Sequence, residues 1–299
     1  LKSVDFSLRG GEICALLGEN GAGKSTLMNI LGGVLRPDAG QILLDDKPQT
    51  FQNPSQSLDA GIAFIHQELN LINDLPIYEN MFIGRELKKK NGFLDHPRMI
   101  AETRKVFERM ALTLDPRAMV RDLDASYKQI VEISRALLMN AQIIIMDEPT
   151  VAVDPQSRNK ILEGIVELNR QGSTIIYTSH YMEEVEQICT RIAIIDHGRV
   201  LASGTTEELK KMIKTGETIT IEAVALTKNN LADIRSLSHV FDLSYQDQTM
   251  ILRCSGAKHN LIRVLNYLQE QDIPFGRVFS ELPTLNDVFL EITGKELRD

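Results

Sequence analysis

The stretch GENGAGKST at residues 18–26 constrains the fold of this chain more than any other feature. It follows an apolar run of strand length, EICALL (12–17), and precedes a pattern of helical spacing, STLMNILGGV (25–34). Its glycines and lysine fit the pattern GxxxxGK[ST], in which the backbone amides of a glycine loop surround phosphate groups. A strand, a glycine loop and a helix in this order predict an α/β fold that binds the phosphates of a nucleotide.

The phosphates are expected at the N-terminus of the helix, where the partial positive charge of the N–H groups favours an anion. We expect Lys24 to reach the β- and γ-phosphates and Ser25 to ligate Mg²⁺. The alternative is a glycine-rich turn that only precedes a core helix, and the complete match disfavours it. The residues expected to contact the nucleotide are Gly18, Asn20, Gly21, Ala22, Gly23, Lys24, Ser25 and Thr26.

Further strand-like runs lie at 62–66 (IAFIH), 143–147 (IIIMD), 174–178 (TIIYT) and 191–196 (RIAIID). Helical patterns separate most of them, and this alternation predicts a P-loop NTPase core with a mainly parallel sheet covered on both faces. Residues of about 70–140 have few strand signals, so we expect a helical subdomain inserted into the core. The pattern changes again after residue 215, which predicts a small C-terminal α/β domain. The expected domains are therefore a nucleotide-binding domain over 1–214 and an accessory domain over 217–299.

Polar side chains follow several of these strands. Asp147 and Glu148 end the run IIIMD, at the sheet edge where ligands of open α/β sheets bind. Asp147 is a candidate Mg²⁺ ligand and Glu148 a candidate general base for an attacking water. His180 follows TIIYTS and is a candidate donor to the γ-phosphate, and Gln67 follows IAFIH, within reach of Mg²⁺ and water. Each residue taken alone also fits an ordinary turn, helix cap or surface position, and only the combination favours catalysis.

Composition narrows the class of partner. The 299 residues carry a net charge of −8, which disfavours nucleic acid, and the short basic run at 88–90 is interpreted as a solvated loop. Three cysteines without C-x-x-C spacing indicate neither a disulfide framework nor a zinc site and fit a reducing, cytoplasmic setting. No apolar run approaches the length of a membrane span, so a membrane role requires a partner. Because the chain opens with Leu1, we expect part of its natural N-terminus to be missing.

The motifs together resemble those of ABC-transporter ATPases over residues 1 to about 214. GENGAGKST, Gln67 in IHQE and the Asp147–Glu148 pair resemble the Walker A, Q-loop and Walker B motifs, and Asp154 in VAVDP and His180 in TSHYMEEVE resemble the D-loop and H-loop. The resemblance implies a subunit that binds ATP and Mg²⁺ and hydrolyses ATP to drive a transmembrane permease, lying on the inner face of the cell membrane through that permease. It also implies a homodimer that closes head to tail around two ATP molecules.

The signature motif departs from the family pattern. The family's LSGGQ aligns with LDASY at 123–127, so Asp124 and Ser126 are expected near the γ-phosphate of the opposite subunit. A carboxylate at position 124 would face an anion there, although Asp124 is also a favourable N-cap for the helix that follows. The aromatic residue on which the family usually stacks adenine would lie before the LKSVDFSL segment (1–8), outside this chain.

The resemblance also divides along the chain. Residues 1 to about 150 resemble ATPases of ribose- and galactose-type sugar importers, and the remainder resembles ATPases of multidrug or polysaccharide exporters. This division is compatible with a natural recombinant, an engineered chimera or simple divergence. Two other functions remain as alternatives: a soluble ABC protein acting on ribosomes or DNA, and a nucleotide-binding regulatory module with little hydrolysis.

Overall fold

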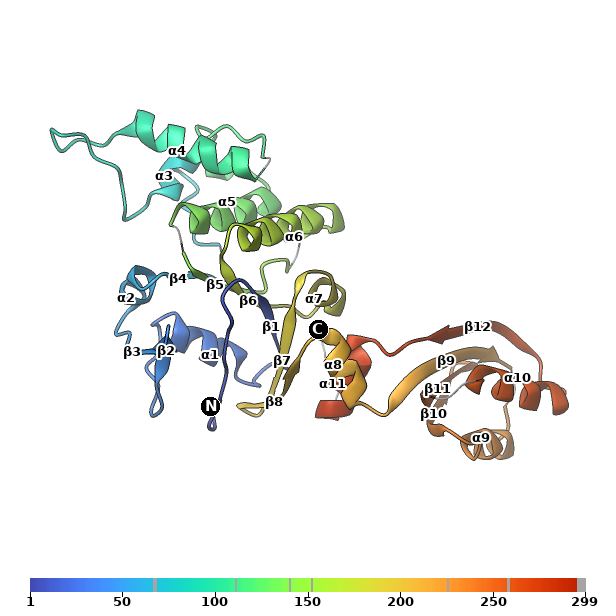
Figure 1. Ribbon diagram of the computed structural model, residues 1–299. Coiled ribbons are helices and arrows are strands. Elements are labelled where there is room, and N and C mark those ends of the chain that lie inside the picture. The colour runs from blue at the N-terminus through green and yellow to red at the C-terminus, as the bar shows by residue number, and fades with distance from the viewer. Residues whose placement is uncertain are drawn as a thin grey trace. The chain divides into compact units, whose positions relative to one another are not determined.

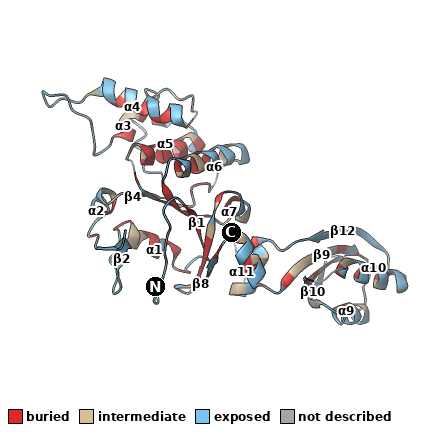
Figure 2. Cartoon of the chain, viewed as in Figure 1, coloured by how far each residue is buried: buried red, intermediate tan, exposed pale blue. Residues whose placement is uncertain are grey.

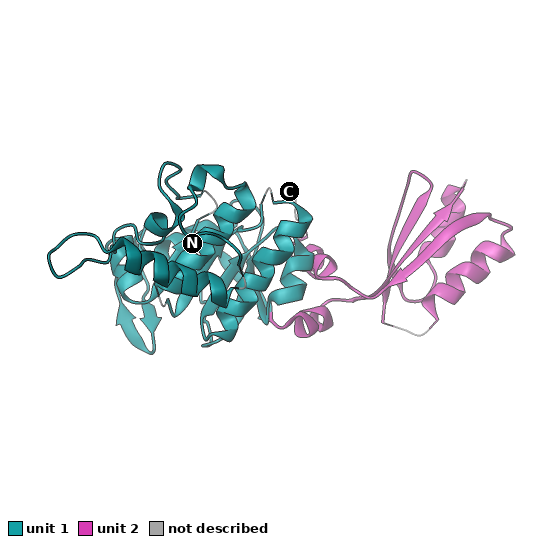
Figure 3. Cartoon of the chain, turned by 90° about the horizontal axis from the view of Figure 1, so that it is seen from above, with its two compact units in different colours: residues 1–203, 298–299 teal, residues 204–297 magenta. Residues whose placement is uncertain are grey.

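The computed structural model describes residues 1–66, 69–110, 112–139, 141–151, 153–224, 226–256 and 259–294 (Figure 1). These residues form two compact units, residues 1–203 and residues 204–297 (Figure 3). Each unit has its own sheet and its own buried core. The two units are therefore described separately.

A six-stranded sheet forms the centre of the first unit. Its strand order is β4-β5-β6-β1-β7-β8, and the pairs β4–β5, β5–β6, β6–β1 and β1–β7 are parallel. The expected mainly parallel sheet is confirmed. The strands are β1 (Ile13–Leu17), β4 (Ile62–Ile65), β5 (Ile143–Asp147), β6 (Thr174–Thr178), β7 (Arg191–Asp196) and β8 (Arg199–Gly204).

The central strands are built from aliphatic residues because both of their faces are buried. Every residue of β1 and β6 is buried, and Figure 2 shows buried residues running along the strands of the sheet. The helices of this part are α1 (Lys24–Leu31), α2 (Pro54–Asp59), α6 (Pro155–Arg170) and α7 (Met182–Ile188). Strand β2 (Ile42–Leu44) pairs with β3 (Lys47–Gln49) in a separate antiparallel ribbon.

A helical segment lies between β4 and β5. It contains α3 (Ile77–Met81), α4 (His96–Arg109), the 3₁₀ turn Val120–Asp122 and α5 (Ala125–Leu138). Helices α3, α4 and α5 contact one another, and α5 also packs against α6 of the core. Within the described part of 69–139, β-pairing is limited to two isolated bridges, as expected for a helical insertion.

The second unit contains a four-stranded antiparallel sheet with the order β10-β11-β9-β12. Its core combines alternate residues of these strands with apolar residues of the helices α9 and α10. The elements are α8 (Thr206–Met212), β9 (Thr215–Ala223), α9 (Lys228–Arg235), β10 (Val240–Gln246), β11 (Thr249–Ser255), α10 (Asn260–Glu270), β12 (Phe275–Glu281) and α11 (Leu285–Thr293). Both helices and strands are present, as the sequence predicted for this part of the chain.

The compact units divide between Ser203 and Gly204, whereas the sequence placed the domain boundary after residue 214. The difference arises from α8, the first helix of the second unit in the sequence, which contacts α11, the last helix described there. The carboxylate of Glu291 strengthens this association by accepting from the backbone N–H of Lys214 at 2.6 Å and the hydroxyl of Thr215 at 3.0 Å. Our division at 214 stays a prediction about independent folding.

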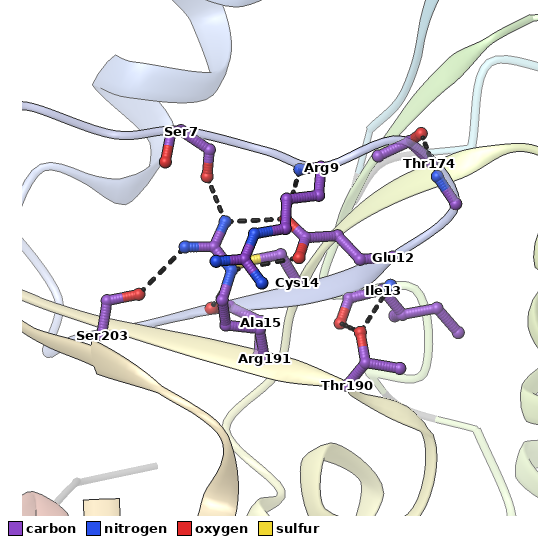
Figure 4. A network of polar contacts seen from close by, with 11 residues as sticks. Ser7, Arg9, Glu12, Ile13, Cys14, Ala15, Thr174, Thr190, Arg191 and Ser203 are labelled. Carbon is purple, nitrogen blue, oxygen red and sulfur yellow. Dashed lines mark hydrogen bonds and ion pairs between the residues drawn. The ribbon is translucent and has the colours of Figure 1, made fainter. Parts of the chain in front are cut away.

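Arg191 ties the strands next to the glycine loop to the N-terminal segment (Figure 4). Its guanidinium donates to both carboxylate oxygens of Glu12, at 3.1 and 2.7 Å, and to Ser203 Oγ at 3.1 Å. It also donates to the backbone carbonyl of Ser7. The same Glu12 carboxylate accepts from the backbone N–H of Arg9 at 2.7 Å. A single ion pair thus joins residues before β1 to β7 and β8.

We predict that Arg191→Ala lowers the free energy of unfolding by roughly 3 kcal/mol, because removing one partner of a largely buried pair leaves the Glu12 carboxylate without compensation. Arg170→Ala is the matched control, since the Arg170–Glu167 pair lies on an exposed helix surface and should contribute little. Urea unfolding of both variants measures the difference. Equal midpoints would contradict a structural role for Arg191.

Candidate functional site

A pocket of about 630 Å³ opens at the glycine loop of the first unit. It lies at the carboxyl ends of β1, β5 and β6, which is where parallel sheets place their ligand sites. The loop, the first turn of α1 and the residues after β5 and β6 line it. The lining residues are Glu19, Asn20, Gly21, Gly23, Lys24, Ser25, Thr26, Asp147, Glu148, Val151, His180 and Tyr181.

Two glycines permit the backbone path of the loop. Gly23 caps the N-terminus of α1 with φ of 111°, a conformation that side chains rarely adopt. Gly18 passes so close to β7 that a Cβ atom there would lie 2.4 Å from the carbonyl oxygen of Ile195. The backbone N–H groups of the first turn of α1 therefore face the pocket at the positive end of the helix, where an anion binds favourably.

Lys24 is buried at the floor of this loop. Its ammonium donates to the carbonyl oxygens of Gly18 at 2.5 Å and Glu19 at 3.3 Å. Burial lowers the pKa of Lys24, while the carboxylates of Glu148 and Asp147 oppose that shift. The positive end of the side chain is thus held in the loop and balanced by acidic groups at the carboxyl end of β5.

The end of β5 is fixed by its pairing with β6. The register places Asp147 opposite Thr178, whose hydroxyl donates to Asp147 Oδ1 at 2.8 Å and accepts from the backbone N–H of Glu148 at 2.9 Å. Glu148 has φ of 49°, in the left-handed region that costs a residue with a side chain about 1 kcal/mol or more. The Thr178 hydroxyl therefore stabilises a turn that directs the two carboxylates into the pocket.

His180 contacts Glu148 directly. Its Nε2 lies 2.5 Å from Glu148 Oε1, and both side chains are only 13% exposed. A proton on Nε2 makes this contact a hydrogen bond to the carboxylate. The imidazole and the carboxylate expected to act in one reaction thus lie side by side at the edge of the pocket.

A buried carboxylate organises the loops behind these residues. Glu184 Oε2 accepts hydrogen bonds from Thr150 Oγ1 at 2.8 Å, Tyr177 Oη at 2.6 Å and Ser179 Oγ at 2.7 Å. Its other oxygen lies 3.1 Å from Nε of Arg158. Because Thr150 follows Glu148 and Ser179 precedes His180, this Glu184 cluster (Thr150, Arg158, Tyr177, Ser179 and Glu184) connects both loops to α6 and α7.

The cluster also reaches the rim of the pocket. The Arg158 guanidinium lies over the Tyr181 ring, 4.0 Å from its centroid, and Tyr181 lines the pocket. Burial and the neighbouring Glu184 carboxylate raise the pKa of Tyr177 well above its usual range, so its hydroxyl remains a donor to Glu184. The sequence gave no sign of this role, because a glutamate within MEEVE resembles one of several on a solvated helix.

The residues of the signature and D-loop motifs lie at two helix N-termini. Asp124 caps α5 by accepting from the backbone N–H of Tyr127 at 2.8 Å. Asp154 caps α6 by accepting from the N–H groups of Gln156 and Ser157, and hydrogen bonds from Ser157 lower its pKa. Ser126 is buried, and its hydroxyl donates to Asp154 Oδ2 at 3.5 Å.

Most of the residues expected at the site line one pocket. Asn20, Gly21, Gly23–Thr26, Asp147, Glu148 and His180 lie around it, while Gly18 and Ala22 support the loop from behind. Asp124, Ser126 and Asp154 are not among the lining residues in the described part of the chain. Gln67 lies outside the described residues. Sequence reasoning missed the lining residues Glu19, Val151 and Tyr181, because they stand beside the motif positions to which a role was assigned.

Comparison with known proteins identifies the family. The family model described as ABC transporter matches residues 1–151 of this chain. The linearmycin resistance ATP-binding protein LnrL of Bacillus subtilis is 36% identical over 100% of this chain and 95% of its own length. The chain belongs to the ABC transporter family. The ribose import ATP-binding protein RbsA of Chromobacterium violaceum is 44% identical over 219 residues, which are 71% of this chain and 43% of that protein. The chain thus spans less than half of the length of the ribose import relatives.

Solved ATP-binding cassettes of ABC transporters share the fold of the first unit. A nucleotide-free cassette superposes with a TM-score of 0.62 at 26% identity, covering 70% of this chain and 86% of its own. A dimeric post-hydrolysis cassette bound to ADP and Pi gives a TM-score of 0.59 at 26% identity, covering 69% and 90%. These matches confirm the family resemblance and the P-loop NTPase fold class, and they support ATP binding by this ABC transporter chain.

In the described residues, no helix is both long and apolar enough to cross a membrane.

We predict that Glu184→Gln lowers the free energy of unfolding by about 3 kcal/mol, since the half-buried Arg158 guanidinium loses its counter-charge while side-chain shape is retained. Glu183→Gln removes the same charge from the exposed neighbouring position and is the matched control. Urea unfolding measures both variants. Equal stability of the two would show that the Glu184 cluster does not hold the loops.

Proposed function

We propose that this chain is the ATP-binding and ATP-hydrolysing subunit of a membrane transporter. The observation that carries the proposal is the position of Lys24 and the N-terminus of α1, which lie across one pocket from Asp147, Glu148 and His180. A cationic loop beside strand-end carboxylates suits phosphoryl transfer to water, because one side holds the phosphates while the other activates the nucleophile.

The loop residues would bind the nucleotide. The backbone N–H groups of the loop and of the first turn of α1 hold phosphate oxygens, and Lys24 exchanges its carbonyl contacts for the β- and γ-phosphates. The hydroxyl of Ser25 and the carboxylate of Asp147 are hard oxygen donors of the kind that Mg²⁺ prefers, and Gln67 is the third proposed ligand. Mg²⁺, when bound, would neutralise charge on the phosphate oxygens.

Hydrolysis is assigned to the residues after β5 and β6. Glu148 accepts a proton from the attacking water, and its contact with His180 orients the carboxylate. When nucleotide is bound, Nε2 of His180 would exchange this contact for a γ-phosphate oxygen and donate to it as negative charge develops there. Gln67 would help to position the same water.

A second copy would complete each site. We propose a homodimer of nucleotide-binding domains in which Asp124, Ser126 and Asp154 approach the nucleotide of the partner, and a transmembrane permease that anchors the pair at the inner face of the membrane. The named relatives support the transport role, since one is a ribose import protein and one a linearmycin resistance protein. A regulatory module with little hydrolysis is the second candidate, and Asp124 in place of the family's serine favours it.

We predict that two substitutions in this pocket affect different quantities, one the binding of Mg-ATP and the other its hydrolysis. Lys24→Ala should weaken Mg-ATP binding, because only backbone donors remain for the phosphates. Glu148→Gln should preserve binding and lower hydrolysis on the order of 10²-fold or more, since the amide keeps the shape but accepts no proton. Isothermal titration and phosphate-release assays measure the two quantities. Unchanged affinity in Lys24→Ala, or lost binding in Glu148→Gln, would contradict the assigned roles.

We predict that Asp124→Ser as a single substitution raises the ATPase rate, and that in the Glu148→Gln background it raises the ATP-dependent dimer population. Unit charges about 4 Å apart at an effective dielectric constant near 20 repel by roughly 4 kcal/mol. Lys128 offers limited relief, because its ammonium donates to the Asn73 side chain at 3.0 Å. Serine retains the helix cap while removing the charge.

Asp122→Ser removes a neighbouring exposed charge and is the control for this prediction. Phosphate release in the Asp124→Ser single variant and light scattering in the Glu148→Gln background report the two effects. If neither quantity rises, Asp124 acts only as a helix cap. A rate that stays near zero in every variant would favour the regulatory module.

A further inference from the structure

The segment between α3 and α4 forms a self-contained hairpin turn. The backbone N–H of Lys89 donates to the carbonyl of Phe93 at 2.8 Å, and the N–H of Asp95 donates to the carbonyl of Leu87 at 2.7 Å. A bridge between Lys88 and Leu94 lies between these bonds. Figure 1 shows this part of the chain extending beyond α3 and α4 as a long loop. We call residues 87–95 the basic hairpin.

The acidic residues at the base of the hairpin have structural roles. Glu86 accepts from the backbone N–H of Gly84 at 2.9 Å, and Asp95 caps α4 by accepting from the N–H of Arg98 at 3.3 Å. At the same end, Arg85 donates to the Asp59 carboxylate at 3.3 Å. These contacts anchor the hairpin to the helical segment and to α2.

The hairpin itself carries three cations and an exposed apolar surface. Lys88, Lys89 and Lys90 are all exposed, and none forms an ion pair with another residue in the described parts of the chain. Phe93 is 73% exposed and Leu94 is 38% exposed. A solvated loop explains the lysines but not a phenylalanine held beside them with most of its ring in water.

We propose that the basic hairpin binds the surface of an anionic membrane, with the lysines at the lipid phosphates and Phe93 inserted between headgroups. Lysine clusters are attracted to anionic lipids, and an aromatic side chain beside them gains by leaving water at the interface. The proposal goes beyond the ATPase function and rests on it only for the expectation that a permease brings the chain to a membrane.

The charge distribution favours a membrane over a nucleic acid. The chain as a whole carries −8, so a polyanion that wraps the protein would meet repulsion over most of its length. A projecting hairpin can contact a flat membrane while the acidic remainder of the protein lies farther away. Charges farther than a Debye length of about 8–10 Å from the lipids are largely screened and add little repulsion. Once a permease holds the chain at the membrane, even weak contact is reinforced by high effective concentration.

The chain contains no tryptophan, so Phe93→Trp introduces a single fluorescent reporter in the hairpin. The full-length variant is titrated with vesicles of phosphatidylcholine and phosphatidylserine in equal amounts, and with vesicles of phosphatidylcholine alone. We expect a blue shift with the anionic vesicles only, and its loss in 1 M salt, where the Debye length falls to about 3 Å. Phe279→Trp, at a half-exposed position on β12, is the matched control and should not respond.

In the Phe93→Trp background, combining Lys88→Gln, Lys89→Gln and Lys90→Gln should weaken partitioning into anionic vesicles on the order of 10²-fold. Replacing the exposed Lys47, Lys211 and Lys228 by Gln removes the same charge elsewhere and should leave partitioning unchanged. A missing blue shift, an equal response of Phe279→Trp, or equal effects of the two triple variants would overturn the proposal and favour an acidic protein partner. Mg-ATP binding by the same variants tests the proposed function separately.

Discussion

The ion pair and hydrogen bonds of Glu184 are the interaction on which the geometry of the pocket depends. One buried carboxylate connects the loop after β5, the loop after β6 and the helix α6. A charge in this position is costly unless it is compensated, and three hydroxyl donors to one carboxylate oxygen and the Arg158 guanidinium beside the other provide that compensation. The loops that carry Glu148 and His180 are therefore coupled to each other rather than held separately.

This coupling complements the register of the sheet. Parallel pairing of β5 with β6 sets Asp147 opposite Thr178, and the Thr178 hydroxyl then supports the left-handed turn at Glu148. The strand register thus positions the backbone of the site, while the Glu184 cluster positions the loops beyond the strand ends. Neither arrangement alone would bring the imidazole of His180 within 2.5 Å of the carboxylate of Glu148.

The sequence predicted those parts of the fold that depend on local patterns. β5, β6 and β7 have the predicted bounds because a buried strand must be aliphatic on both faces. For the second unit only a mixed α/β character was predicted, because strands such as β10 (VFDLSYQ) place polar residues on a solvated face. The compact units divide at residue 203 because α8 is held by α11, a contact between segments far apart in the chain that no local pattern indicates. The glycine loop and strand-end carboxylates were predictable from motif and context, whereas Tyr181 and Glu184 act through tertiary contacts that no spacing indicates.

Because the two units have separate cores, sequence changes in one core need not be matched by changes in the other during evolution. The first core joins residues of β1, α1 and β5–β7, while the second joins only residues of the second sheet and its two helices. The second unit is a single continuous stretch of chain, residues 204–297. Insertions, deletions or replacement of that stretch can therefore accumulate in evolution without disturbing the packing behind the glycine loop. The same first unit can thus be combined with different second units.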